Sequence, residues 1–405
     1  MNVLYLSYDG MTDPLGQSQV LPYLGGLSQR GHRFTLISFE KREKYAQHRQ
    51  VIESFCHAHH IDWKPLPFSQ RPTLLSKLWD VRQMLKEAGR QMSGQRFDLV
   101  HCRSYISAWV AVRLKSKYGT PFLFDMRGFW VDERVEGGLW NLKNVFFNRA
   151  YQWAKLEEVK LLRQADGVIS LTQAALHPIH RWLAGTKQPI FQVIPCSVDT
   201  DLFTLPTSTS RTTARARLGL TSEHLVLGYL GSLGTWYLLD EMVDFFRLLR
   251  AEHHHAKFLF ITPGEQEKVK DLFLRKGLSL TDCLLTTASR QEVAHLLAAV
   301  DVGIMFIKPS FSKTASSPTK LGEMLATGIP VVCNAPVGDV EEIIQRTDGG
   351  IALHDFKEDS FRSVISLLPQ FLAADRSQIR ARALDYYDLP LAIEKYDSVY
   401  QQLSR

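Results

Sequence analysis

The residue types and spacings best suited to chemistry occur in one segment, residues 308–334, which reads KPSFSKTASSPTKLGEMLATGIPVVCN. Ser317 and Pro318 are typical of a helix start, with the serine side chain as cap and the proline at the first helical position. The first turn of that helix carries Lys320 and no acidic residue, although the helix dipole favours negative charge there. A bound anion would remove this conflict.

The free amides at this helix start, the neighbouring hydroxyls and the lysine ammonium together predict a site for a diphosphate. The residues concerned are Ser316, Ser317, Thr319 and Lys320. Glu323 follows Lys320 by one helical turn, and a carboxylate in that place can accept hydrogen bonds from both hydroxyls of a ribose. The alternative interpretation is that Lys320 and Glu323 form a surface ion pair, which contributes little to stability.

This segment resembles the nucleotide-binding element of the retaining glycosyltransferases of family 4, which have the two-domain GT-B fold. The stretch SPTKLGEMLATGIPVV is similar to that family's Pro-x-Lys-x-x-Glu, helix, Gly-x-Pro-Val-Val arrangement. Two further stretches agree in the right order, ADGVISLT at 165–172 and VIPCSVDTDLF at 193–203. The resemblance implies that Glu323 binds the donor ribose and that Lys320 and the preceding loop hold the diphosphate.

The chain departs from the family pattern at two places. Many members carry a second glutamate eight residues before the first, where this chain has Ala315. Many members also place an Arg and a Lys after a glycine to contact the diphosphate, where this chain has Thr235, Trp236 and Tyr237. Recognition of the donor sugar is therefore expected to differ, and the two aromatic residues either stack on a sugar or base or pack against the sheet.

Two glycine-containing turns are further candidates for donor binding. Gly231 and Ser232 lie in a tight turn after an apolar run, where backbone can approach a phosphate, unless the turn is an ordinary strand-to-helix loop. The segment 9–27 resembles the family's first loop, which lies over the donor diphosphate and acceptor. Gly16 and Gln17 occupy its turn.

The catalytic candidates follow two apolar runs of the first half. Asp125 and Arg127 lie two residues apart after the run at 121–126, so either they pair with each other or they meet a ligand. We expect Asp125 to position the acceptor hydroxyl and Arg127 to bind a phosphate or another anion of the acceptor. His101 ends the preceding run and is either a proton carrier or a hydrogen-bonded structural histidine.

Other patterns do not predict a metal site. Asp199 and Asp201 mimic the Asp-x-Asp motif of the other main glycosyltransferase fold, but they lie at the expected domain junction. The histidines at 57–60 and 253–255 lack carboxylate or cysteine companions at ligand spacing. The family resemblance also implies no metal requirement, so we expect a nucleotide sugar as co-substrate and no cofactor.

The elements that must position these residues form two similar series. Apolar runs alternate with longer helical patterns, which is typical of βαβ units around a parallel sheet. Expected strands of the first half are 3–8, 33–39, 60–66, 97–102, 121–126, 167–171 and 190–195, and those of the second half are 225–230, 257–262, 283–287, 302–307, 330–334 and 349–353. Helices are expected at 236–252, 318–327, 361–374 and 391–403, among others.

The sequence thus predicts an α/β protein of GT-B type, with two Rossmann-like doubly wound domains facing a cleft. The polar stretch 205–217 has no apolar period and is expected to be a linker. We therefore expect an acceptor domain at 1–204 and a donor domain at 205–386. The helix at 387–405 is expected to pack back on the first domain.

Length and charge limit the other classes of function. The chain has 405 residues and a net charge of +6, which favours anionic partners weakly. The basic residues are scattered and show no zinc-finger or basic-zipper pattern, so we expect no nucleic-acid partner. The five cysteines are far apart and never in a CxxC pair, which is typical of free thiols in a reducing compartment.

The location of the chain is expected to be the cytoplasm or a membrane surface. Its first residues contain no basic leader, and the uncharged stretch 225–239 is too short to cross a bilayer. The segment 71–96 places Leu78, Trp79 and Leu85 among basic residues. This pattern suits either peripheral contact with an anionic membrane or a helix packed on the sheet with a basic outer face.

The resulting expectation is a retaining hexosyltransferase that acts in cell-surface polysaccharide or glycolipid synthesis. Its partners would be a nucleoside-diphosphate sugar and a carbohydrate or lipid-linked acceptor. Two alternatives stay open. One is a GT-B nucleotide-sugar epimerase, and the other is a non-catalytic nucleotide-binding subunit of a polysaccharide assembly, which Ala315 and the missing basic pair after Gly231 would suit.

Overall fold

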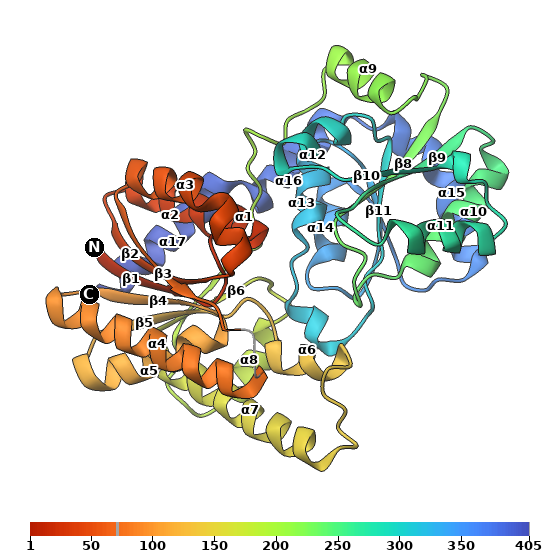
Figure 1. The fold of residues 1–405 in the computed structure, drawn as a ribbon. Helices are drawn as coiled ribbons and strands as arrows, with labels where there is room; N and C mark the ends of the chain where they lie inside the picture. The colour runs from red at the N-terminus through yellow and green to blue at the C-terminus, as the bar shows by residue number, and fades with distance from the viewer. Residues whose placement is uncertain (70–72, 405) are drawn as a thin grey trace. The chain divides into compact units, whose positions relative to one another are not determined.

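The computed structural model of the chain describes residues 1–69 and 73–404. The chain divides into two compact units, shown in Figure 1. The first unit comprises Met1–Pro195 and Leu389–Arg405, and the second unit comprises Cys196–Asp388. The second unit is thus a continuous piece of chain inserted between two pieces of the first.

The first unit is built on seven parallel strands in the order β3-β2-β1-β4-β5-β6-β7. The strands are β1 (Asn2–Ser7), β2 (Arg33–Glu40), β3 (Ile61–Pro67), β4 (Leu99–Arg103), β5 (Phe122–Asp125), β6 (Gly167–Ser170) and β7 (Ile190–Val193). The helices are α1 (Pro14–Gln19), α2 (Leu21–Gln29), α3 (Arg42–Ala58), α4 (Thr73–Gly94), α5 (Ser104–Tyr118), α6 (Trp130–Glu136), α7 (Val145–Gln164), α8 (Leu176–Trp182) and α17 (Leu389–Leu403). In Figure 1, α2, α3 and α17 cover one face of the sheet, and α4, α5 and α7 cover the other.

The second unit repeats this plan with six parallel strands in the order β10-β9-β8-β11-β12-β13. The strands are β8 (Leu225–Leu230), β9 (Ala256–Ile261), β10 (Cys283–Thr286), β11 (Val302–Met305), β12 (Val331–Asn334) and β13 (Gly350–Leu353). The helices are α9 (Ser208–Arg217), α10 (Leu239–Glu252), α11 (Gln266–Arg275), α12 (Arg290–Leu297), α13 (Thr319–Ala326), α14 (Val340–Thr347), α15 (Glu358–Ala373) and α16 (Arg376–Tyr387), with 3₁₀ turns η1 (Leu280–Asp282) and η2 (Phe311–Ala315). Separate apolar clusters cover the two faces of this sheet.

The thirteen expected strands all form, and their ends differ from the expected ones by only a few residues. Strands buried on both faces are near-continuous apolar runs, so the sequence signal is strong. The C-terminal helix α17 packs on α2 in the first unit. The contact is close, because a Cβ at Gly26 would lie only 2.1 Å from Ile393 Cδ1.

The prediction that residues 205–217 form a linker is wrong. Most of it is the helix α9, which Thr207 caps by accepting a hydrogen bond from the amide of Ser210. Arg211 and Arg215 of this helix pair with Asp301 of the second unit. Of the apolar residues of α9 only Ala214 is buried, and the arginine ion pairs add polar contacts, so the search for apolar periodicity could not find this helix.

The division between the units also lies nearer the N-terminus than the expected boundary at 204/205. Val198 and Phe203 are buried in the core of the second unit, so the chain has entered that unit before residue 204.

Among the described residues, no helix is long and apolar enough to cross a bilayer.

Candidate functional site

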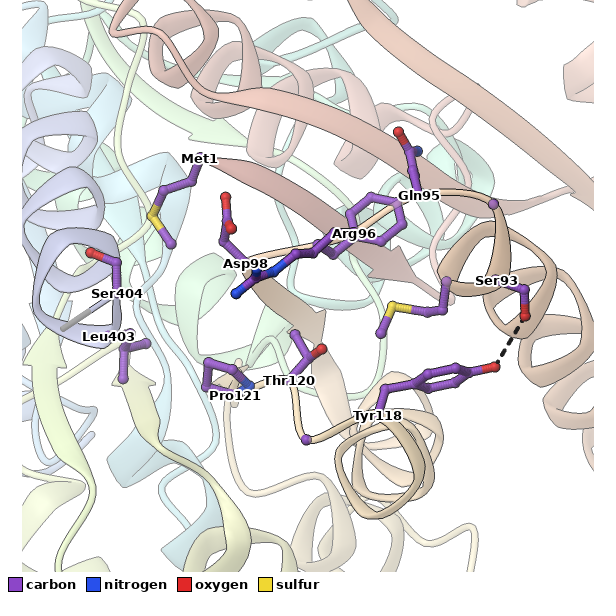
Figure 2. Close-up of a pocket in the computed structure, with 14 residues that line it drawn as sticks. Met1, Ser93, Gln95, Arg96, Asp98, Tyr118, Thr120, Pro121, Leu403 and Ser404 are labelled. Atoms are coloured by element: carbon purple, nitrogen blue, oxygen red, sulfur yellow. Dashed lines mark hydrogen bonds between the residues drawn. The ribbon is translucent and has the colours of Figure 1, made fainter.

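Ligands of doubly wound sheets bind outside the carboxyl ends of the strands. A cavity of about 1050 Å³ lies at the opposite edge of the first unit's sheet, where Met1, Asp98 and Pro121 precede β1, β4 and β5. Figure 2 shows Arg96, Asp98 and Thr120 around this hollow. Its position at the amino ends of the strands argues against this cavity as the site, and the predicted residues lie elsewhere.

In the second unit, the side chain of Lys320 reaches the carboxyl end of the central strand β8. The residue is only 8% exposed. Its Nζ donates a hydrogen bond of 2.9 Å to the Tyr229 hydroxyl and lies 3.6 Å from the ring centroid of Tyr237. The alternative of a surface ion pair with Glu323 is therefore wrong, because the ammonium is buried against aromatic rings.

The turn after β8 lies directly against this ammonium. Gly231 has a φ of +107°, a conformation that favours glycine. A Cβ at this position would lie 3.0 Å from Lys320 Nζ, so any side chain here would press on the ammonium. The Tyr229 hydroxyl also donates a 2.6 Å hydrogen bond to the carbonyl oxygen of Ser232. Gly231 and Ser232 thus form the expected turn after a strand, and the structure places this turn beside Lys320; their contact with a donor stays a prediction.

Glu323 lies one turn further along α13 and is half-buried, with its side chain 12% exposed. Its Oε1 is 3.7 Å from Nη1 of Arg290, the first residue of α12. Sequence reasoning missed Arg290. The signal available was the capping box that Ser289 and Glu292 form, which fixes a helix start and therefore the position of the arginine beside it.

Burial changes the ionisation of both residues on α13. It lowers the pKa of the Lys320 ammonium well below its usual range, and the Glu323 carboxylate opposes this change. Burial raises the pKa of Glu323 to about 7, although Arg290 and Lys320 favour the ionised form. A lysine and a glutamate that are both costly to keep charged are typical of sites where a ligand supplies the missing charge.

The helix start differs from the expected one in its cap. Pro318 rather than Ser317 is the N-cap residue of α13, and no side chain caps the helix. The Ser317 Oγ instead accepts a 3.1 Å hydrogen bond from the amide of Cys196. Ser316 and Thr319 are half-buried in the same loop.

The segment that departs from the family pattern supplies a second lysine. Lys313 in η2 is buried, and its Nζ lies 3.7 Å from the ring centroid of Trp236. Ala315 is buried two residues later. Trp236 and Tyr237 therefore each face a lysine ammonium, Lys313 and Lys320 respectively.

In the first unit, the predicted catalytic residues meet in one buried cluster. Asp125 and His101 are 1% and 2% exposed. The Tyr396 hydroxyl of α17 donates a 3.1 Å hydrogen bond to Asp125 Oδ2, and His101 Nδ1 lies 2.7 Å from the Tyr400 hydroxyl. Arg127 Nη1 lies 3.7 Å from Asp125 Oδ1. Asp125 and Arg127 thus pair with each other, as one of the two interpretations predicts. His101 is a hydrogen-bonded buried histidine.

The charges of this cluster are fixed by its geometry. Burial raises the pKa of Asp125, but Arg127, His101 and Arg103 outweigh that effect and lower it to about 2. Burial lowers the pKa of His101. Among the described residues, His101 Nε2 and Asp125 Oδ1 are buried without a hydrogen-bond partner. Asp125 is therefore ionised while His101 tends to be neutral.

Arg127 is the member of this cluster nearest to the surface. Its side chain is 10% exposed, and its φ of +59° is unusual for a residue with a side chain. Such strain persists only where the surroundings enforce it, and it is common at binding sites. Arg103, at the end of β4, pairs with Asp9 of the first loop at 3.2 Å.

The first loop is held by a residue that sequence reasoning missed. The buried Glu40 carboxylate at the end of β2 accepts hydrogen bonds from the amides of Met11 and Thr12, at 2.8 and 3.0 Å. Gly16 is buried, and a Cβ there would lie 2.2 Å from the Gly10 oxygen. Gln17 donates a 3.2 Å hydrogen bond to the Thr12 carbonyl oxygen. The structure thus gives Gly16 and Gln17 a role in shaping the loop, and donor contact by them stays a prediction.

No group of three His, Cys, Asp or Glu side chains is arranged to hold a metal ion in the part of the chain that the structure describes. Asp199 Oδ1 accepts a 3.1 Å hydrogen bond from the amide of Leu202. The independence from metal stays a prediction.

Comparison with known proteins identifies the class that this fold and these residues define. Residues 17–196 match the glycosyl transferase 4-like domain, and residues 224–370 match glycosyl transferases group 1. The two matches together span most of the chain. The chain therefore belongs to the family 4-like glycosyltransferases with the GT-B fold.

A curated relative is TuaH of Bacillus subtilis (strain 168), whose name gives it as a candidate glycosyltransferase of teichuronic acid biosynthesis. It is 25% identical over 180 residues, which are 44% of this chain and 42% of TuaH. The match thus spans less than half the length of either protein.

Two solved structures share the fold over nearly their whole length. HepE of Anabaena, in complex with UDP and glucose, has a TM-score of 0.71 at 18% identity, with 98% of each chain covered. Sucrose-phosphate synthase of Thermosynechococcus elongatus has a TM-score of 0.73 at 16% identity, with 100% of this chain and 99% of the other covered. The predicted GT-B fold, with its two Rossmann-like domains, is confirmed.

Proposed function

We propose that this protein transfers a hexose from a nucleoside-diphosphate sugar to an acceptor hydroxyl with retention of anomeric configuration. The observation that carries the proposal is the buried Lys320 ammonium at the end of β8, which packs on tyrosine rings beneath a glycine turn. Keeping a lysine charged in such a place costs free energy unless an anion pairs with it. A diphosphate is the anion that the helix start of α13 suits.

The second unit would hold the donor. Lys320 and the amides of the Gly231 turn would contact the diphosphate, and Glu323 would accept hydrogen bonds from the ribose hydroxyls. Lys313 lies in the segment where the family's usual glutamate is missing, so we assign it to the leaving phosphate or the sugar. It would replace one cation of the basic pair that this chain lacks after Gly231.

In the reaction, the bond between the anomeric carbon and the diphosphate oxygen breaks, and a bond to the acceptor oxygen forms on the same face. Negative charge grows on the departing diphosphate, and the acceptor hydroxyl gives its proton to the phosphate oxygen that leaves on the same face. Lysine ammonium groups and backbone amides fixed around that charge stabilise it without reorganisation, which is the largest catalytic effect available here.

The first unit would position the acceptor. Asp125 and His101 are buried, so we assign them to positioning rather than to direct contact. Their role would be to hold Arg127, whose half-buried guanidinium suits a phosphate or carboxylate of the acceptor. A polysaccharide or a lipid-linked sugar would be the acceptor class, and the name of TuaH supports a polysaccharide.

The test combines binding and turnover. Calorimetric titration with UDP, without added metal, should give a Kd that rises at least tenfold in Lys320→Met and in Glu323→Ala. The control is Lys268→Met on α11, which removes an exposed lysine and should leave the Kd unchanged. UDP is the first nucleotide to test because HepE crystallised with it.

Turnover then distinguishes the alternatives. Incubation with UDP-glucose and a polysaccharide fragment should release UDP, and NMR of the new linkage should show the donor's anomeric configuration. Inverted configuration would overturn the proposed mechanism. Tight nucleotide binding without turnover of any tested sugar would favour the non-catalytic subunit, and conversion of the donor without an acceptor would favour the epimerase.

A further inference from the structure

The face of the first unit formed by α4, α5 and α7 has an apolar groove that the proposed reaction does not use. The groove has a volume of about 720 Å³. Its lining includes Trp109, Trp130, Trp140 and Trp153, which are four of the eight tryptophans of the chain. In Figure 1 the three helices lie on the same face of the sheet.

The helix α7 carries an exposed apolar ridge beside this groove. Phe146, Trp153 and Leu156 are 82%, 56% and 71% exposed. At about 100° per residue, these three positions lie on one side of the helix, together with Arg149 and Lys160. We call these five residues the α7 ridge. Large aromatic and aliphatic groups alternating with cations on one helix face are typical of helices that lie in a membrane interface.

The helix α4 extends the apolar surface on the other side of the groove. Leu78 and Trp79 are 64% and 60% exposed, while Leu85 is partly buried. The inner side of α4 packs on the first unit, where Met84 and Ala88 are fully buried, while Leu78 and Trp79 on its outer side give an apolar surface suited to membrane contact. Solvent-exposed apolar groups gathered over several helices mark an interaction surface.

The positive charge of this face favours an anionic partner. Together α4, α5 and α7 contain eleven Lys and Arg residues against four Asp and Glu, a net charge of +7, whereas the whole chain carries +6. The rest of the molecule is thus close to neutral. Two copies of this face would repel each other, so self-association through it is disfavoured. An anionic surface that also accepts apolar side chains complements both properties.

We propose that the α7 ridge, the groove and the exposed residues of α4 dock this protein on an anionic phospholipid membrane. Phe146, Trp153 and Leu156 would enter the headgroup and upper acyl region, and Arg149 and Lys160 would contact lipid phosphates. The Trp109 indole Nε1, which lines the groove side of α5, is buried without a hydrogen-bond partner among the described residues. A lipid carbonyl or phosphate oxygen would satisfy it.

Flotation of the full-length protein with vesicles tests this proposal, and it needs neither donor nor acceptor. Binding should be strong to vesicles of phosphatidylcholine with 40% phosphatidylglycerol and at least tenfold weaker to phosphatidylcholine alone. Leu156→Ser should weaken binding severalfold. Its matched control is Leu274→Ser on α11, which changes the same residue type at 58% exposure and should have no effect.

A second pair of variants tests the charges. Arg149→Glu with Lys160→Glu should reduce binding to anionic vesicles at least tenfold, while Lys268→Glu with Arg275→Glu on α11 makes the same change in net charge and should reduce it little. Circular dichroism would show that all variants fold.

Equal effects of the α7 and α11 pairs would overturn the proposal, because they would indicate a response to net charge alone. Failure of the wild type to float with anionic vesicles would also overturn it. A concentration-dependent dimer that Leu156→Ser abolishes would instead assign the ridge to a second copy. UDP binding is measured separately, so a failure here leaves the proposed reaction intact.

Discussion

Glu323 is the residue at which ionisation and ligand binding meet most directly. Its pKa of about 7 means that much of the carboxyl is protonated at neutral pH, whereas the ionised form is the better acceptor for two ribose hydroxyls. Lys320, the other charged residue of α13, is affected in the opposite direction, because burial lowers the pKa of its ammonium and so favours the neutral form. The two residues therefore give the proposed nucleotide site its own pH dependence.

The affinity for UDP should fall as the pH decreases below about 7, with a slope that approaches tenfold per pH unit. The β-phosphate of UDP also titrates near pH 6, so the informative quantity is the ratio of wild-type to Glu323→Gln affinity. Calorimetric Kd values between pH 5.5 and 8.5 measure this ratio. It should rise up to about pH 7 and then level off, and a constant ratio would remove Glu323 from the ribose site.

The raised pKa of Glu323 should also make the stability of the fold depend on pH, and Glu323→Gln should remove this dependence. A carboxyl whose folded-state pKa is raised from 4.5 to about 7 stabilises the fold at low pH, and that stability is lost as the pH rises through 7. The loss is of order 3 kcal/mol, which glutamine avoids. Urea unfolding should therefore show a stability gain in the variant that is larger at pH 8 than at pH 5. A gain that is independent of pH would contradict the raised pKa.

At the scale of elements, the helix α17 buries the residues at the ends of β4 and β5 and so limits their contact with a ligand. Its two tyrosines close over His101 and Asp125, although they lie nearly 300 residues further along the chain. The sequence could therefore place Asp125 at the end of a strand but could not show that α17 buries it. The strands themselves were predictable, because local apolar runs specify them.

Other elements escaped prediction for similar reasons. The helix α9 is polar and pairs with Asp301, which is distant in the sequence. The local sequence therefore has no apolar periodicity that would predict this helix. Ser317 has the residue type of a cap, but the amide of Cys196 takes its oxygen. Lys320 was predicted because its charge conflicts with its position in the helix and because its segment resembles the family's nucleotide-binding element, whereas its tyrosine partners come from another segment.

Tyr400→Phe should destabilise the first unit, because it removes the partner of the buried His101 Nδ1 at 2.7 Å. The expected loss is about 1–3 kcal/mol, the cost of leaving a buried polar atom unsatisfied. Tyr45→Phe on α3 is the control, since it removes a tyrosine hydroxyl on another helix of the same unit. Thermal unfolding measures both variants, and equal melting temperatures for Tyr400→Phe and the wild type would mean that α17 does not hold the cluster.

At the scale of the whole molecule, each unit has its own sheet and core. Calorimetry should therefore resolve two unfolding transitions rather than one. UDP at a hundred times its Kd should stabilise the unit that holds it by about 2.7 kcal/mol. Gly322→Ala identifies the transition of the second unit, because a Cβ at this position would lie 2.8 Å from Tyr387 and Val198 and should lower the melting temperature of that unit. The proposed nucleotide site lies in the same unit. UDP should therefore shift this transition most. A larger shift of the other transition would place the nucleotide in the first unit.

The insertion of the second unit between β7 and α17 also sets an order of events during synthesis. A ribosome completes the seven strands of the first unit long before it makes Leu389–Leu403, and residues 196–388 emerge in between. During that interval the buried side of α2 and the ends of β4 and β5 lack their cover, while the second unit already has all of its chain. The inserted unit can thus finish folding before the unit that surrounds it in sequence, and the nascent first unit is the stage at which a chaperone would be needed.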